Sequence, residues 1–391
     1  MDFRFNTKFR DLRTSKSLQS QNLQTISDGC SPRFLGCASR FLNLLTLVHG
    51  GSHKILHAGF PGYGESAWLY SEEMPEREED GNPMTVLSEL SDLQNCQLCP
   101  RKCGVNRSVN VGFCRCSAGI RAARAALHHW EEPCISGSRG SGAIFFSGCT
   151  LCCCFCQNHA ISHEYAGKDL SPRRLSDIFL RLQQEGAHNI NLVTPTQYLP
   201  LILSALDLVR HRLQIPVVYN CGGYERKEVV LALKDYVDIW LPDLKYYDTD
   251  LSRRYSGAAD YFAVASQAVL QMILQTGAPH FHIEEDCPSP LMDRGVIIRH
   301  LVLPGHKEDS LLLLHWMAES LPKGQYYISL LSQYTPICQS SQYPELNRRI
   351  TSYEYQKVVD TALELGLDQG FLQQKNSAKE EYTPPFDLTG L

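Results

Sequence analysis

The sequence predicts an α/β fold in which a parallel sheet is covered by helices on its outer face. From residue 141 onward, short apolar runs alternate with longer amphipathic stretches, the order expected of repeated strand and helix units. Helix start and stop signals flank the first amphipathic stretch. The chain, with 391 residues, is long enough for one large core with or without a small module.

The elements follow one another in a regular order. The first strand, at 141–147, leads into a cysteine-rich loop. Ser171 and Pro172 begin a helix that ends at Gly186, because Ser caps a helix and Pro fits its first position. Five more strands are expected at 190–194, 215–220, 237–243, 294–303 and 325–331. The other helices are expected at about 197–213, 225–235, 260–276, 308–321 and 352–366.

The remaining segments suggest four parts. Residues 1–90 have no sustained period, are first rich in Ser and Arg and then acidic, and are expected to form a disordered extension. A Cys-rich module is expected at 91–135, the main core at 136–373 and a flexible tail at 374–391. The basic first sixteen residues are compatible with a mitochondrial presequence, although Asp2 and Asp11 count against one.

Composition limits the functional classes. The net charge is −5 and no long Lys/Arg run occurs, so the overall charge does not favour nucleic-acid binding, although a local basic patch remains open. The 16 cysteines cluster at metal-type spacings, and no secretory signal is apparent, which favours a reducing compartment such as the cytoplasm. The apolar run at 41–48 is too short to span a bilayer, so we expect no membrane segment.

The loop after the first strand contains five cysteines in eight residues. One register gives the spacing C-x3-C-x2-C, formed by Cys149, Cys153 and Cys156. Three thiolates can bind three irons of a 4Fe–4S cluster and leave the fourth iron open to a cofactor or substrate. The alternative is zinc bound by the pairs Cys149/Cys152 and Cys153/Cys156, but such adjacent pairs cannot easily close a tetrahedron.

A second cysteine set precedes the predicted barrel. Cys96, Cys99, Cys103 and Cys114 have the spacing C-x2-C-x3-C-x10-C. Four thiolates are sufficient for a closed zinc site or for an auxiliary iron–sulfur cluster. An Ala/Arg-rich stretch follows this set and ends at His128 and His129, which we expect to be structural residues at the end of a helix.

Distinctive polar residues lie at or near the ends of the predicted strands. Because the carboxyl ends of parallel barrel strands face the same side, these residues are expected to converge with the cysteine loop. They are Thr194, Asn220, Asp243, Lys245, Arg299 and Gln333.

Several sequence blocks give the chain a specific resemblance. They include the cysteine loop followed by Gln157-Asn158, together with 130–133, 190–196, 218–225, 241–246 and 299–305. With these blocks, residues 93–373 resemble the radical S-adenosylmethionine (radical SAM) superfamily, and within it the pyruvate formate-lyase activating enzyme-like proteins. The chain departs from the usual loop at Thr150, Cys152 and Cys154.

The resemblance implies a fold, cofactors and roles. It implies a partial (β/α)6 barrel, a 4Fe–4S cluster with SAM on its open iron, and an electron donor similar to flavodoxin or ferredoxin. The SAM carboxylate needs a cation, for which Lys245 or Arg299 is expected, and Asp243 is expected to bind the ammonium or a ribose hydroxyl. Phe155 resembles the aromatic residue that touches adenine. Thr194 and Asn220 complete the expected cofactor site.

The expected reaction is reductive cleavage of SAM to a 5′-deoxyadenosyl radical, which abstracts hydrogen from a substrate. By similarity to glycyl-radical activases, that substrate is a protein. Two alternatives remain open: the same chemistry on RNA or a small metabolite, and a non-catalytic iron–sulfur or zinc-binding protein. Formation of 5′-deoxyadenosine separates the last alternative from the others.

Overall fold

The computed structural model of the chain describes residues 3–4, 92–336, 342–373 and 383–391. The chain divides into two compact units, one formed by Met1–Lys16 with Gly81–Leu391 and the other by Ser17–Asp80. The second unit lies outside the described residues, as does most of the N-terminal extension expected at residues 1–90. Both cysteine sets and all the predicted strands belong to the first unit.

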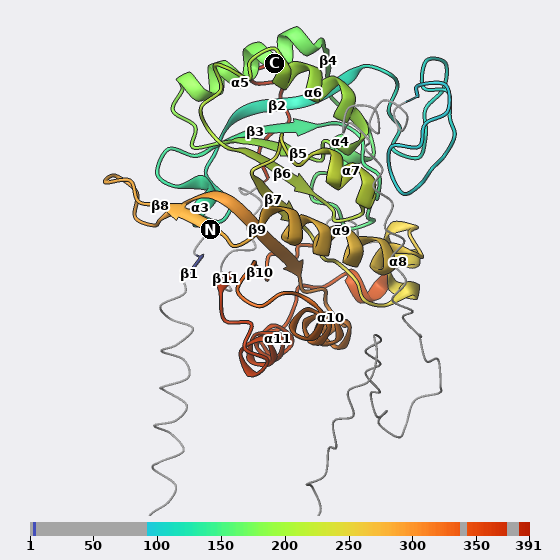
Figure 1. Ribbon diagram of the computed structural model, residues 1–391. Coiled ribbons are helices and arrows are strands. Elements are labelled where there is room, and N and C mark those ends of the chain that lie inside the picture. The colour runs from blue at the N-terminus through green and yellow to red at the C-terminus, as the bar shows by residue number, and fades with distance from the viewer. Residues whose placement is uncertain (1–2, 5–91, 337–341, 374–382) are drawn as a thin grey trace, which may run out of the picture. The chain divides into compact units, whose positions relative to one another are not determined.

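Parallel strands form the centre of the sheet and neighbour one another in chain order (Figure 1). Most of their residues are buried, since helices cover the outer face and other side chains fill the inner face. The strands are β3 (Ser141–Phe146), β5 (Ile190–Val193), β6 (Val217–Cys221), β7 (Ile239–Pro242), β9 (Leu291–Leu301), β10 (Tyr327–Leu331) and β11 (Gly370–Gln373). The first six confirm the predicted α/β class, and β11 was not predicted.

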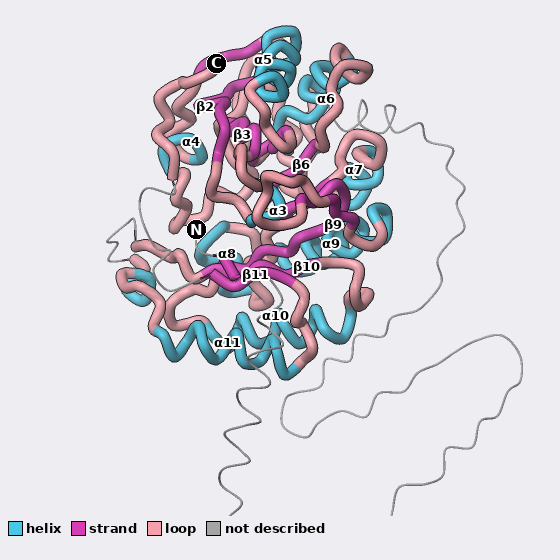
Figure 2. Tube along the Cα trace, turned by 90° about the vertical axis from the view of Figure 1, so that its left-hand side faces the viewer, coloured by secondary structure: helices cyan, strands magenta, loops and turns pink. Residues whose placement is uncertain are grey.

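Helices connect the strands and cover the outer face of the sheet. Ser171 caps the first long helix as expected, and Thr351 forms a capping box with Glu354 at the last. Figure 2 shows α10 and α11 beyond β10 and β11. The connecting helices are α5 (Pro172–Gln184), α6 (Leu199–Asp207), α7 (Lys227–Ala232), α9 (Tyr261–Thr276), α10 (Lys307–Ser320) and α11 (Ser352–Glu364). Short helical segments are α3 (Pro133–Ser136), α4 (His159–Ser162), η1 (Thr196–Tyr198), α8 (Thr249–Ser256) and η2 (Pro344–Leu346).

Antiparallel strands extend the sheet at both ends, so the barrel is partial, in agreement with the predicted fold class. β2 (Ile120–His128) pairs with β3, and β4 (Lys168–Leu170) pairs with β2. At the other end β1 (Phe3–Arg4) pairs with β11. β8 (His280–His282) forms a hairpin with β9.

Two expectations about secondary structure and order are corrected. The Ala/Arg-rich stretch before His128 is strand β2 rather than a helix, because pairing with β3 outweighs the helix propensity of Ala. Residues 383–391, expected within a flexible tail, lie against β2. Leu388 N donates to Ala123 O at 3.0 Å, Ala125 N donates to Thr389 O at 2.9 Å, and the Phe386 and Phe145 ring centroids are 5.6 Å apart.

The alternation of side chains along the strands separates the core from the barrel interior. Tyr219, Trp240 and Ile298 point outward into the main core under the helices. Their neighbours Val218, Leu241 and Ile297 point inward and pack with Ile135 of α3 in a separate apolar cluster. Among the described residues, none of the helices is both long and apolar enough to cross a membrane.

A truncated protein that begins at Ser91 is expected to keep its fold and both predicted metal sites. It loses only the two residues of β1 from the described sheet, while the barrel strands and both cysteine sets remain. Its iron content and its thermal unfolding midpoint should therefore match those of the full chain. If the predicted cleavage of SAM falls below half the full-length rate while the predicted cluster is intact, the removed segment contributes to the site.

Candidate functional site

The cysteine loop begins directly beyond β3, where the strand leaves the sheet at Ser147 and Gly148. Gly148 has φ = 79°, and a Cβ atom there would lie 2.2 Å from Cys116 Sγ. Only glycine fits this tight approach without strain. The loop is therefore held at the carboxyl end of the parallel strands, where barrel proteins place their sites.

Sulfur atoms of the predicted cluster ligands accept hydrogen bonds. Ser256 Oγ donates to Cys153 Sγ at 3.0 Å, and Leu151 N donates to Cys149 Sγ at 3.4 Å. Burial and the neighbouring thiols raise the pKa of Cys149 and Cys156. Such thiols become stable thiolates only beside a cation, so the loop fits a metal cluster that supplies positive charge.

The extra cysteine Cys152 is arranged differently. Its thiol donates to Cys149 O at 3.2 Å and to Ser162 O at 3.5 Å, and its backbone has φ = 46°. A thiol that donates to carbonyl groups is occupied as a structural group. This geometry favours the register formed by Cys149, Cys153 and Cys156, which remains a proposal.

Opposite the loop, inward positions at the strand ends form a buried network of charges. Lys245 Nζ lies 2.6 Å from Asp243 Oδ2, and Arg299 Nε lies 3.0 Å from Asp243 Oδ1. Arg299 also contacts Glu131 Oε2 at 3.2 Å and donates to Asn220 Oδ1 at 2.5 Å. The alternation of β6, β7 and β9 places these side chains one step beyond the inward apolar residues.

The opposite charges of the network keep one another ionised. Burial raises the pKa of Asp243, but the adjacent Lys245 and Arg299 outweigh burial and lower it. For Lys245, burial lowers the pKa, and the Asp243 carboxylate outweighs it in the opposite direction. At neutral pH these groups are therefore ionised. Arg299 has three protein acceptors, whereas the Lys245 ammonium contacts one carboxylate and carries three donor hydrogens.

Sequence reasoning missed Glu131 as a member of this network. Its carboxylate accepts from Asn191 Nδ2 at 3.1 Å and from Asn220 Nδ2 at 3.2 Å, in addition to its contact with Arg299. Burial raises the pKa of Glu131 despite that contact. The 130–133 block carries a sequence signal, since it is one of the blocks on which the resemblance to a known family rests.

Other predicted site residues lie around the network and the loop. Thr194 adopts φ = 59°, a strained conformation that often marks a functional site. Phe155 is buried among Tyr246, Tyr255 and Tyr334, with ring centroids 6.2–6.4 Å away. Gln333 O accepts from Gln157 Nε2 at 3.2 Å, which ties the end of the cysteine loop to the end of β10.

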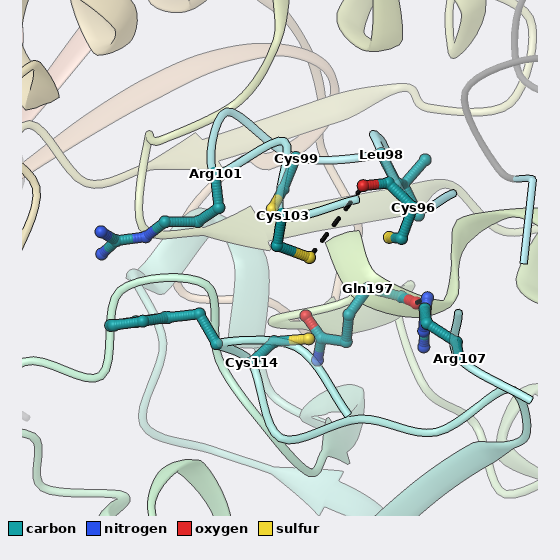
Figure 3. A pocket seen from close by; sticks show the side chains of 9 residues that line it. Cys96, Leu98, Cys99, Arg101, Cys103, Arg107, Cys114 and Gln197 are labelled. Atoms are coloured by element: carbon teal, nitrogen blue, oxygen red, sulfur yellow. Dashed lines mark hydrogen bonds between the residues drawn. The ribbon is translucent and has the colours of Figure 1, made fainter. Parts of the chain in front are cut away.

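The second cysteine set packs directly against the barrel. Figure 3 shows Cys96, Cys99, Cys103 and Cys114 around one pocket, with Gln197 at its edge. Cys103 is exposed and the other three are buried. The structure therefore brings together both predicted ligand sets at the same end of the barrel.

Glu225 gives the fold a pH dependence. Its carboxylate accepts from Thr196 Oγ1 at 2.6 Å and from Tyr219 OH at 3.4 Å, yet burial outweighs these bonds and raises its pKa to about 8. The folded state thus retains a proton that the unfolded state releases near its ordinary pKa of 4.5. We expect the free energy of unfolding to fall as pH rises from 4.5 to about 8, by at most about 1.4 kcal/mol per pH unit. Urea unfolding of Glu225→Gln should show a shallower fall, and equal slopes would contradict the prediction.

Sequence comparisons with known proteins bear on the family of the chain. A profile described as the Radical SAM superfamily matches residues 143–271. The chain is 30% identical over 285 residues to protein MJ0674 of Methanocaldococcus jannaschii, an alignment that covers 70% of this chain and 76% of that protein.

The chain also resembles several solved structures at low identity and with TM-scores below 0.5. A domain of pyruvate-formate lyase-activating enzyme from Bacteroides vulgatus is 16% identical with a TM-score of 0.31, covering 52% of this chain and 91% of that one. SuiB of Streptococcus suis bound to the precursor peptide SuiA is 13% identical with a TM-score of 0.38, covering 58% and 46%. Methylornithine synthase is 16% identical with a TM-score of 0.39, covering 57% and 60%.

A partial barrel with a cysteine loop after its first parallel strand defines a class of iron–sulfur enzymes. The chain belongs to the radical SAM superfamily. Its cofactors are accordingly a 4Fe–4S cluster and S-adenosylmethionine.

Proposed function

We propose that the protein reductively cleaves S-adenosylmethionine and uses the resulting radical to abstract hydrogen from a protein substrate, as glycyl-radical activases do. When bound, the cluster and SAM supply the chemistry: one electron breaks a carbon–sulfur bond to give methionine and a 5′-deoxyadenosyl radical. The observation that carries the proposal is the position of Cys149, Cys153 and Cys156 beside the buried network of Asp243, Lys245 and Arg299.

Lys245 is the better candidate to bind the SAM carboxylate. Its ammonium has donors beyond the contact with Asp243, and the thiols of Cys153 and Cys156 act on its pKa, so it lies near the cluster loop. A flexible ammonium can contact a second carboxylate without leaving the first. The Asp243 carboxylate, beside Lys245, would accept a hydrogen bond from the SAM ammonium.

Arg299 is better suited to positioning than to binding. Its guanidinium contacts Asp243, Glu131 and Asn220 from three different elements, which fixes the direction of the Asp243 carboxylate. Tyr261 OH adds a second constraint, because it accepts from Lys245 N at 2.9 Å. The burial of these groups would exclude water from the reacting atoms.

Partners and compartment follow from the same chemistry. Cleavage needs an electron donor, for which a flavodoxin- or ferredoxin-like protein is suited. Among the described residues no cysteine forms a disulfide, which favours a reducing compartment such as the cytoplasm.

Deuterium transfer identifies the substrate class. The reconstituted enzyme is incubated in ordinary water with unlabelled SAM and with a lysate of cells grown in deuterated medium, separated into protein, RNA and small-molecule fractions. We expect deuterium in 5′-deoxyadenosine when the protein fraction is present, because abstraction moves one carbon-bound deuterium from the substrate to the 5′ carbon. Transfer only from RNA or only from small molecules would replace the proposed substrate, and absence of 5′-deoxyadenosine from every reaction would overturn the proposed cleavage.

A further inference from the structure

The second cysteine set surrounds a space that lacks a protein occupant. At Gly112, an added Cβ would lie 2.9 Å from Cys103 Sγ and 4.0 Å from Cys114 Sγ, so glycine keeps the region between these sulfurs open. Two buried atoms of pocket-lining residues, Arg107 Nε and Gln197 Oε1, have no hydrogen-bond partner. A donor such as Arg107 Nε beside four thiols is suited to a sulfur-rich, negatively charged group.

The spacing of the sulfurs favours a cluster over a single zinc ion. Tetrahedral zinc with bonds of about 2.3 Å holds its thiolates about 3.8 Å apart. The sulfurs of the cysteine set are not that close together. In the described part of the chain, the group of three possible ligands whose atoms all lie within 4.8 Å of one another is His188, Glu284 and Cys287. Four sulfurs that each bind a cluster iron lie farther apart than zinc ligands do, which agrees with this wider arrangement.

Short connections join this site to the cysteine loop. Arg101, two residues after Cys99, donates from Nε to Thr150 O at 2.9 Å and from Nη2 to Ser256 O at 2.8 Å. Ser256 in turn donates to Cys153 Sγ. A second connection runs from Cys114, whose carbonyl accepts from Cys116 Sγ at 3.2 Å and lies against Gly148, next to Cys149. The two ligand sets are therefore coupled through a few bonds.

The outer surface of the Cys-rich segment suits an acidic protein partner. Between residues 93 and 119 the sequence contains no acidic residue, and the basic side chains of Lys102 and Arg115 are exposed. Exposed apolar side chains lie in the same segment, with Val109 74%, Val111 55% and Phe113 43% exposed. The exposed ligand Cys103 lies beside exposed Lys102, so the basic and apolar surface includes the edge of the site.

We propose that Cys96, Cys99, Cys103 and Cys114 bind a second iron–sulfur cluster through which electrons enter the enzyme. A reduced, acidic electron-carrier protein docks on this surface and gives up one electron, which reduces the second cluster. That cluster is reoxidised when it passes the electron to the cluster at Cys149, Cys153 and Cys156. No bond to carbon is made or broken and no proton moves in this transfer. The delivery step rests on the proposed SAM cleavage, whereas the presence of the cluster does not.

Metal content tests the site itself. After anaerobic reconstitution, the triple variant Cys149→Ala, Cys153→Ala and Cys156→Ala should retain iron and matching sulfide, with a paramagnetic signal after reduction by dithionite. Adding Cys99→Ser and Cys103→Ser should remove that iron, while circular dichroism reports whether the chain stays folded. One zinc per chain without iron in the triple variant, or no metal at all, would overturn the proposal.

The electron source tests the relay. In the otherwise unaltered enzyme, Cys99→Ser with Cys103→Ser should lower SAM cleavage driven by reduced flavodoxin and its reductase at least tenfold relative to cleavage driven by dithionite. Equal losses with both reductants would overturn the relay while leaving the proposed SAM cleavage intact. If the wild-type enzyme does not cleave SAM with dithionite, the proposed function itself is wrong.

A surface variant tests docking without touching a ligand. Lys102→Glu with Arg115→Glu should raise the flavodoxin concentration needed for half-maximal rate at least fivefold at low salt, and the difference should shrink as salt is added. Lys323→Glu is the matched control, because it is exposed in the loop before β10, at the opposite ends of the strands. An equal effect of the control, or no effect of the double variant, would overturn the docking surface.

Discussion

Replacement of any one of Cys149, Cys153 and Cys156 by Ala should abolish SAM cleavage by the anaerobically reconstituted protein. Each thiolate is expected to hold a different iron, and a cluster that has lost one of its three ligands cannot keep the open iron available for SAM. Cys152→Ala and Cys154→Ala should leave cleavage largely intact. The measurement is the amount of 5′-deoxyadenosine formed with dithionite as reductant.

The matched pair Cys152 and Cys153 makes this prediction specific. The two residues are adjacent, but the Cys152 thiol donates to backbone carbonyls whereas Cys153 Sγ accepts from Ser256 Oγ. Equal loss of activity in Cys152→Ala and Cys153→Ala would rule out the proposed register. Residual iron in the single variants is expected at the second cysteine set and does not bear on the result.

Lys245→Met should mainly weaken SAM binding, whereas Arg299→Met should mainly lower the stability of the fold. Removal of the ammonium that binds a buried carboxylate costs on the order of 2 to 5 kcal/mol, so Lys245→Met should weaken SAM binding at least tenfold. Arg299→Met should lower the free energy of unfolding by about 3 kcal/mol or more, because it leaves Glu131 and Asp243 without their shared cation. Equilibrium dialysis with labelled SAM and urea unfolding provide the two measurements.

Lys323→Met serves as control for both measurements, since Lys323 is exposed. If both network variants bind SAM as the wild type does, the pocket lies elsewhere. If Arg299→Met loses SAM affinity at unchanged stability, Arg299 is the carboxylate ligand and the two roles must be exchanged.

The barrel strands could be predicted from the sequence because their signals are local. The apolar runs that became β3, β5 and β9 are strongly biased toward buried strands, and helix boundaries such as Ser171 have a chemical cause. The class of cofactor could be predicted for the same reason, since the cysteine spacing lies within one loop.

Features that depend on distant contacts could not be predicted. β2 contains Ala, a residue that favours helices, at three of its four buried positions, and it becomes a strand through pairing with β3. Glu131 belongs to the site because it meets Arg299, a residue 168 positions away. Lys245 and Arg299 are equivalent cations in the sequence, and only their acceptors in the folded chain distinguish the proposed ligand from the positioning residue.

The segment 383–391 has a consequence for solubility. By pairing with Ala123 and Ala125, it occupies backbone hydrogen-bonding groups on the side of β2 that faces away from β3. A strand with such groups free can pair with the same strand of another molecule. Removal of this segment would thus expose unpaired backbone N–H and C=O groups along β2, away from the residues proposed for catalysis. Its loss would first appear as self-association at high protein concentration rather than as a change in chemistry.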